Sequence, residues 1–171
     1  MNRGKLTQSA LGWGFFLIMC FSAQGLCDKD PLASILLKDV DGKAKAIKLP
    51  GKRPQIIILG NRECAIDSAD WGRHLTEVLG DEVEILSVAE IKHVPALLRS
   101  WVSRKIAREH GRFILLDWEG SLSGHYGLSE PWPHILLYQP NDPSPKQIHG
   151  VYDAQKMQEI LITLGRSEKN S

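Results

Sequence analysis

The fold is decided by residues 115–138, which read LLDWEGSLSGHYGLSEPWPHILLY. This stretch begins as an apolar strand, turns at residues 117–120, continues through a short glycine-rich segment, and ends in a second apolar strand after Pro133. A proline cannot donate to a strand ladder, so it belongs at the first residue of a strand. Proline also makes a cis peptide bond inexpensive. Trp132–Pro133 is therefore a peptide bond, directly before a buried strand, for which the cis form is accessible.

The rest of the chain alternates strand and helix patterns. Asp41-Gly42 is a strong hairpin signal, and the continuous apolar run at residues 56–59 is typical of a parallel strand covered on both faces. Strands are expected at residues 34–38, 43–48, 55–59, 83–88, 112–116, 135–138 and 146–151. Helices are expected from residues 64–68 to Leu79 with Gly80 as the stop, from Pro95 to Gly111, and after the N-cap Asp153.

All three helices carry an apolar side at helical spacing. In the first helix it consists of Ile66, Leu75, Val78 and Leu79. In the second helix the stripe consists of Leu97, Leu98, Trp101, Val102 and Ile106. In the last helix it consists of Met157, Ile160, Leu161 and Leu164. Each stripe predicts the face that packs on a sheet.

The predicted order is hairpin, strand, helix, strand, helix, three strands and helix. Helices between the early strands require parallel pairing, whereas the closely spaced late strands require a hairpin. The expected fold class is therefore α/β, with a central mixed sheet flanked by helices and an N-terminal β-hairpin. This layout resembles the thioredoxin-like superfamily, specifically its redoxin branch (AhpC/TSA-related) and, within that, periplasmic proteins of the YtfJ type. The resemblance is carried by Leu49-Pro50-Gly51-Lys52, the strand leading to Gly60-Asn61-Arg62, the Asp117-x-x-Gly120 turn and Pro133.

Cys64 is the candidate nucleophile. It follows the expected central strand and opens the first long helix, where free N–H groups and the helix dipole stabilise a thiolate. Only the thiolate attacks a disulfide or a peroxide. The resemblance to peroxiredoxins implies an arginine near the sulfur. Arg62 is the candidate thiolate stabiliser, and Arg112 is the alternative. Asn61 takes the place of the threonine that peroxiredoxins carry three residues before their cysteine.

Other features of this segment argue against thiol chemistry. Glu63 and Asp67 place negative charge near the sulfur, which disfavours ionisation. Asp67 also replaces the second cysteine of a C-x-x-C motif, so a local resolving thiol is absent from the motif. A free Cys64, or one bonded to Cys27, in a fold that has lost its chemistry is the alternative. The sequence leaves both interpretations open.

Trp132 and Pro133 are the candidate substrate-binding residues, together with Asn61. The thioredoxin-like resemblance implies that the Trp132–Pro133 bond is cis. It also implies that the residue before the proline lines a groove in which an extended peptide can pair as an added strand. The expected partners are therefore protein thiols or a peptide or protein client. If the redox motif is lost, the same groove would serve a non-enzymatic binding or chaperone-like module.

No cofactor or metal is expected. Cys64, His125, His134 and His149 are chemically suitable ligands, and copper-handling proteins of this fold exist. The chain lacks both their second cysteine and a tight histidine spacing.

The N-terminus predicts export. Arg3 and Lys5 precede an apolar run at residues 11–21 that is too short to span a bilayer comfortably, and Ala23-Gln24-Gly25 fits a cleavage site. We expect a signal peptide at residues 1–25, a flexible N-terminus at 26–33, one domain at 34–165 and a disordered tail at 166–171. The mature protein would be periplasmic or secreted, without stable membrane insertion. An uncleaved anchor and lipidation at Cys27 are the alternatives, although Leu26 is large for a lipidation signal.

The charge balance excludes a global electrostatic attraction. The whole chain carries a net charge of +1, and loss of Arg3 and Lys5 with the signal leaves the mature chain near neutral. No nucleic-acid partner is therefore expected. The arginines and lysine of the second helix are interpreted as the solvated face of an amphipathic helix.

Overall fold

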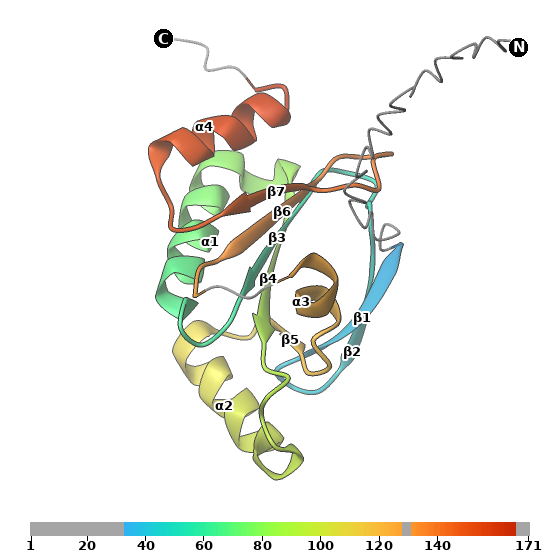
Figure 1. Cartoon of the computed structure of the whole chain (residues 1–171), viewed down its shortest axis with the longest axis vertical. Helices are drawn as coiled ribbons and strands as arrows, with labels where there is room; N and C mark the ends of the chain where they lie inside the picture. The colour runs from blue at the N-terminus through green and yellow to red at the C-terminus, as the bar shows by residue number, and fades with distance from the viewer. Residues whose placement is uncertain (1–32, 128–130, 167–171) are drawn as a thin grey trace, which may run out of the picture.

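The computed structural model describes residues 33–127 and 131–166, whose strands form one seven-stranded mixed sheet (Figure 1). The strands are β1 (Ser34–Asp39), β2 (Ala44–Lys48), β3 (Gln55–Gly60), β4 (Glu84–Glu90), β5 (Leu115–Asp117), β6 (His134–Tyr138) and β7 (Lys146–His149). Their order in the sheet is β2-β1-β5-β4-β3-β6-β7. Strands β3, β4 and β5 run parallel, and the other pairs are antiparallel.

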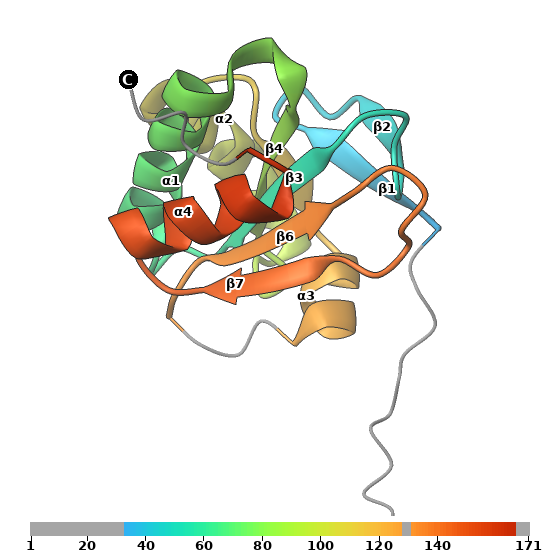
Figure 2. The ribbon, with the colours of Figure 1, turned by 90° about the horizontal axis from the view of Figure 1, so that it is seen from above.

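Helices cover both faces of this sheet. The α-helices in the described residues are α1 (Ala65–Leu79), α2 (Arg99–His110), α3 (Ser121–Tyr126) and α4 (Ala154–Thr163). Short 3-10 turns lie at η1 (Gly80–Glu82) and η2 (Ala96–Leu98). Figure 2 shows α1 and α4 together on one side of β6 and β7 and α3 on the other side. The α/β class with a mixed sheet flanked by helices and an N-terminal hairpin is therefore confirmed.

The face under α1 and α4 is apolar. Its cluster joins alternate residues of β3 and β6 to the buried sides of the two helices. It contains Ile56, Ile58, Trp71, Leu75, Leu79, Val83, Ile135, Leu137, Ile148, Met157 and Ile160. Burial of this apolar surface is the main stabilising term for such a layer.

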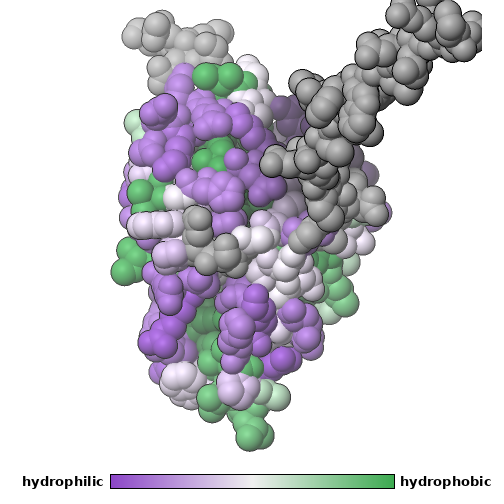
Figure 3. Space-filling model, viewed as in Figure 1, coloured by the Kyte–Doolittle hydropathy of each residue, from purple (hydrophilic) through white to green (hydrophobic). Residues whose placement is uncertain are grey.

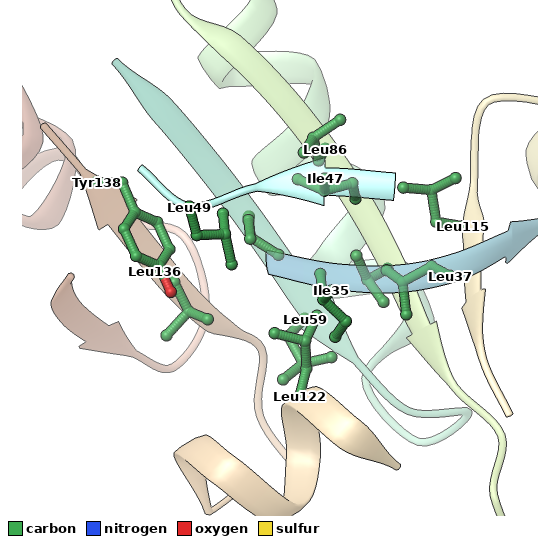
Figure 4. Close-up of a cluster of buried hydrophobic side chains, with 12 residues drawn as sticks. Ile35, Leu37, Ile47, Leu49, Leu59, Leu86, Leu115, Leu122, Leu136 and Tyr138 are labelled. Atoms are coloured by element: carbon green, nitrogen blue, oxygen red, sulfur yellow. The ribbon is translucent and has the colours of Figure 1, made fainter. Parts of the chain in front are cut away.

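The opposite face is covered by the β1–β2 hairpin and α3. Figure 4 shows side chains of the hairpin and of α3 meeting those of the central strands. This cluster contains Ile35, Leu37, Ile47, Leu49, Ile57, Leu59, Leu86, Val88, Leu115, Leu122, Leu136 and Tyr138. The alternation of Ile56 and Ile58 with Ile57 and Leu59 explains why β3 is apolar throughout: it is covered on both faces.

Several local predictions are confirmed. Asp39 accepts hydrogen bonds from the backbone N–H groups of Asp41 (3.0 Å) and Lys43 (2.8 Å), which closes the hairpin turn. Helix α1 ends at Leu79, and Gly80 follows with a φ of 54°. The carboxylate of Asp153 accepts from the backbone N–H of Lys156 at 2.8 Å and caps α4 as expected.

Two predictions are wrong. The glycine-rich segment contains α3, which the sequence interpretation missed. In the second helix, the α-helical part begins only at Arg99, and Leu97, Leu98 and Trp101 are exposed. Only Val102 and Ile106 of that predicted stripe pack against the core. The reason is that α2 lies over β5, a strand of three residues that offers little surface to cover.

The predicted signal peptide at residues 1–25, most of the 26–33 segment and residues 167–171 of the predicted tail lie outside the described residues. Within the described part, no helix has the length and hydrophobicity needed to cross a membrane. Figure 3 shows that hydrophilic residues cover most of the face seen in Figure 1, with apolar atoms at the lower tip, where α2 lies.

Candidate functional site

Cys64 lies between the end of β3 and the start of α1. Strand β3 is buried along its whole length, and residues 61–63 form the loop at its carboxyl end. Cys64 is the N-cap residue of α1, and its carbonyl accepts from the backbone N–H of Ser68 at 2.9 Å, the first bond of the helix. The predicted position of the cysteine at a helix N-terminus is therefore confirmed.

The sulfur of Cys64 is enclosed by its own loop. Cys64 is a free thiol with 0% exposure. The backbone N–H of Asn61 donates to Sγ at 3.3 Å, and the Asn61 side-chain and main-chain oxygens lie 3.5 and 3.7 Å from Sγ. As a thiol, Cys64 can donate to these oxygens, and as a thiolate it can accept from the Asn61 N–H. In the enclosed conformation, no substrate disulfide can reach the sulfur.

Asn61 folds the loop over the sulfur. Its Oδ1 accepts from the backbone N–H of Glu63 at 2.9 Å and from that of Cys64 at 3.3 Å, an Asx-type turn. The same oxygen is the one that contacts Sγ. Asn61, predicted as a substrate-binding residue, is therefore part of the wall around the thiol.

Gly60 and Ser68 complete this wall, and sequence reasoning missed both. A Cβ atom on Gly60 would lie 2.3 Å from Ser68 Oγ and 3.1 Å from Cys64 Sγ, so only glycine permits the observed approach of strand and helix. Ser68 Oγ donates to the Cys64 carbonyl at 2.8 Å and lies 3.9 Å from Sγ. A glycine at the end of a buried strand was the available signal for this close approach.

The structure does not bring Arg62 to the sulfur. Arg62 and Glu63 are exposed. In the described part of the chain, Arg62 makes no hydrogen bond and no ion pair. Its proposed action on the thiolate would thus be exerted across solvent, where charges are strongly screened.

Pro133 lies at the same end of the sheet as Cys64. The β3–β6 register ends with Leu59 opposite His134, so the next positions along the two strands are Gly60 and Pro133. Pro133 is buried, whereas Trp132 is 44% exposed. Ile66, in the first turn of α1, is 78% exposed. Figures 1 and 2 both place the segment that enters β6 beside the start of α1.

The predicted cis bond at Trp132–Pro133 is wrong. The cis peptide bond in the described residues is Leu49–Pro50, and the Trp132–Pro133 bond is trans. The Pro133 carbonyl accepts from the backbone N–H of Gly150 at 3.0 Å, which extends the β6–β7 ladder past His134. An X–Pro bond favours the trans form by about 0.5–1 kcal/mol. With the trans bond, the Pro133 carbonyl already makes its hydrogen bond in the β6–β7 ladder.

No cluster of three potential metal ligands from His, Cys, Asp and Glu is found in the described residues. His125 lies on α3, whereas His134 and His149 face each other across β6 and β7. Asp117, which is fully buried, accepts from the backbone N–H groups of Ser121 and Leu122, both at 2.9 Å, and so anchors the start of α3.

Comparison with solved structures identifies the fold. StoA from Bacillus subtilis superposes with a TM-score of 0.54 at 18% identity, covering 76% of this chain and 96% of its own. The exposed lipoprotein thioredoxin Etrx1 from Streptococcus pneumoniae gives 0.54 at 21% identity, covering 78% and 98%. A secreted disulfide oxidoreductase from Mycobacterium tuberculosis gives 0.52 at 12% identity, covering 76% and 96%.

The fold is thioredoxin-like. At these identities the similarity establishes the fold alone. No family model matches the chain, and no curated protein matches it.

Proposed function

We propose that this chain is an exported thiol–disulfide oxidoreductase that works through the single thiol of Cys64. The observation that carries the proposal is the position of the sulfur: at the N-cap of α1, behind the central strand, and accepting the backbone N–H of Asn61 at 3.3 Å. The thioredoxin-like neighbours, among them a secreted disulfide oxidoreductase, support the same chemical class.

The chemistry is an exchange of disulfides. The Cys64 thiolate attacks one sulfur of a client disulfide, a mixed disulfide forms, and the other client sulfur leaves as a thiolate. An external thiolate then attacks the client sulfur of the mixed disulfide, forms its own disulfide with the client, and releases Cys64 as a thiolate. An external thiol is required because C-A-I-D replaces C-x-x-C at residues 64–67.

Access to the sulfur requires the loop at residues 61–63 to open. Cys64 is fully buried in the closed loop, and the contacts that close the loop come from Asn61. The side chains of Arg62 and Glu63 are exposed and hold nothing in place. Displacement of Asn61 would thus expose the thiol without disturbing the core of the sheet.

A client would lie across Trp132 and Pro133. Trp132 and Ile66 expose apolar surface at the end of the sheet where Cys64 lies. Arg62, on the same loop, would add a positive charge that favours the thiolate once the loop is open. The redoxin resemblance adds peroxide as a second candidate oxidant, but Asn61 in place of the threonine of peroxiredoxins favours disulfides.

Trapping of the mixed disulfide tests the proposal. Reduced protein is incubated with oxidised glutathione, and its intact mass and the modified residue are determined by mass spectrometry. We expect one glutathione to be attached to Cys64 and to be removed again by excess reduced thiol. The Cys64→Ser variant should carry no glutathione, whereas the Cys27→Ser variant should still be modified. Modification of Cys27 with Cys64 untouched would contradict the proposal.

A binding module without redox chemistry is the second candidate function. The observation that favours it is that apolar side chains, rather than the thiol, face solvent at this end of the sheet. In that case Cys64→Ser would bind an unfolded client protein as well as the unmodified chain does, whereas Trp132→Ala would lose binding. The oxidoreductase proposal expects Cys64→Ser to lose covalent capture of that client.

We further propose that residues 1–25 are a signal peptide cut after Gly25, that residues 34–165 are the folded domain, and that the mature protein is periplasmic or secreted. The support is the short apolar run followed by Ala23-Gln24-Gly25. The intact mass of the exported protein tests this. A mass that still includes residues 1–25, or one with lipid attached to Cys27, would contradict it.

A further inference from the structure

Two histidines meet on the face of the sheet that carries α3. His134 and His149 are directly opposite each other in the antiparallel β6–β7 pair, the register of which continues through Ile135 and Ile148. His134 is 3% exposed, whereas His149 is exposed on the edge strand β7. The sequence analysis named both residues as chemically suitable ligands but did not pair them, because only the β6–β7 register brings them together.

Their geometry matches that of two ligands on one metal ion. His134 Nε2 lies 3.3 Å from His149 Nδ1, and the rings meet at 71° with centroids 4.1 Å apart. Two nitrogens bound to a tetrahedral zinc ion at about 2.0–2.1 Å are separated by about 3.3 Å. The observed separation, which the two rings hold as a direct hydrogen bond, therefore also equals the spacing that a shared ion requires.

We propose that His134 Nε2 and His149 Nδ1 form a binding site for a divalent transition-metal ion such as Zn²⁺. Imidazole nitrogen suits zinc, copper and nickel and is a poor ligand for Mg²⁺. In the described residues, no third His, Cys, Asp or Glu joins the pair. Solvent would fill the remaining positions, and the site is accordingly open on the side of His149.

The pairing of β6 with β7 holds the two histidines in place for an ion. The backbone ladder between β6 and β7, including the bond from Gly150 N–H to the Pro133 carbonyl, fixes the two Cα positions before any ion binds. The metal requires both imidazoles to be neutral, so it competes with protons. A bound ion would tie the edge strand β7 to β6, next to the end of the sheet where Pro133 and Cys64 lie.

Calorimetric titration of the protein with ZnCl₂ tests the site. The purified protein carries no polyhistidine tag, and MgCl₂ serves as the comparison ion. We expect one zinc per chain, no binding of magnesium, and a loss of zinc affinity of at least about tenfold in His149→Ala. His149 is exposed, so its replacement leaves the core in place, which a thermal melt of the variant without metal verifies.

Two control variants assign the binding to the pair. His93→Ala, at an exposed histidine outside the hairpin, is expected to bind zinc like the unmodified protein. Cys64→Ser is expected to do the same. The proposal would be overturned if the protein bound no zinc, if His149→Ala bound zinc with unchanged affinity, or if Cys64→Ser lost zinc affinity. Because this experiment measures only zinc binding, a negative result would leave the proposed disulfide exchange at Cys64 unaffected.

Discussion

The two faces of the sheet are built from different kinds of contact. Under α1 and α4 the layer is apolar, with Trp71 as its largest fully buried side chain. Under α3 and the hairpin, the layer also buries polar groups that are paired across elements: Tyr138 with Tyr126, Asp117 with the first N–H groups of α3, and His134 with His149. The first face is thus held mainly by apolar packing, and the second combines apolar packing with paired polar groups.

The largest expected effect is on the apolar face. Trp71→Ala removes a fully buried ring and its hydrogen bond from Nε1 to the Gly150 carbonyl, at 2.9 Å. We expect the free energy of unfolding to fall by about 3–5 kcal/mol, as measured by urea denaturation. Trp101→Ala, at a 52% exposed position of α2, is the matched control and should change it by less than about 1 kcal/mol. Similar losses in the two variants would contradict the assignment of α1 to the core.

On the polar face, Asp117→Ala is expected to have the next largest effect. It leaves the backbone N–H groups of Ser121 and Leu122 without their acceptor in a buried place. Loss of two such bonds should lower the free energy of unfolding by about 2–4 kcal/mol and increase hydrogen exchange in α3. Asp117→Asn keeps one acceptor oxygen and should lose less. If the two variants are equally stable, the carboxylate is not the anchor of α3.

A smaller effect is expected where strand and helix meet at the thiol. Gly60→Ala forces a Cβ against Ser68 Oγ and should lower the free energy of unfolding by about 1–3 kcal/mol. Combining it with Ser68→Ala removes the nearest clashing atom and should restore part of the loss. Gly72→Ala, in α1 with only ordinary contacts at 3.7 Å and beyond, should instead be neutral or gain up to about 1 kcal/mol. An unchanged free energy of unfolding in Gly60→Ala would contradict the close approach of Gly60 to Ser68.

The smallest effect appears only at alkaline pH. Burial and the hydrogen bond with Tyr126 raise the pKa of Tyr138 above its ordinary value of 10.0. The folded chain therefore holds the phenol neutral, while the unfolded chain releases the proton. This contribution to stability is full below pH 10.0 and declines as the pH rises further. The free energy of unfolding of Tyr138→Phe, measured by urea denaturation, should fall less between neutral and strongly alkaline pH than that of the unmodified chain. The fall for Tyr152→Phe should equal that of the unmodified chain. Identical declines in all three proteins would contradict this.

Local patterns predicted most of the fold. Apolar runs located the strands, Asp41-Gly42 the hairpin, Gly80 the end of α1 and Asp153 the start of α4, because each of these signals acts within a few residues. Helix α3 was missed because its start depends on a buried carboxylate, that of Asp117, rather than on apolar periodicity.

The site was predicted in position but not in its surroundings. Placement of Cys64 at the start of α1 followed from the order of elements, whereas Pro133 was tied to the site only by the thioredoxin-like resemblance. The burial of the sulfur did not follow from that order, because it depends on how Asn61, Gly60 and Ser68 fit together in space. The trans bond before Pro133 likewise depends on the ladder that its carbonyl completes with Gly150.

The most direct test of the account is the alkylation rate of Cys64 in the folded protein, measured by mass spectrometry for the unmodified chain and Asn61→Ala. If a working thiol lies behind a loop closed by Asn61, the unmodified chain should react far more slowly than the same chain in denaturant. Loss of the Asn61 contacts should ease opening by about 1–3 kcal/mol, which raises the rate at least about fivefold. Asn61→Asp keeps the acceptor oxygen and should not accelerate. Equal rates in the unmodified chain and Asn61→Ala, with Cys64 inert in both, would contradict the gated thiol and leave the binding module as the function.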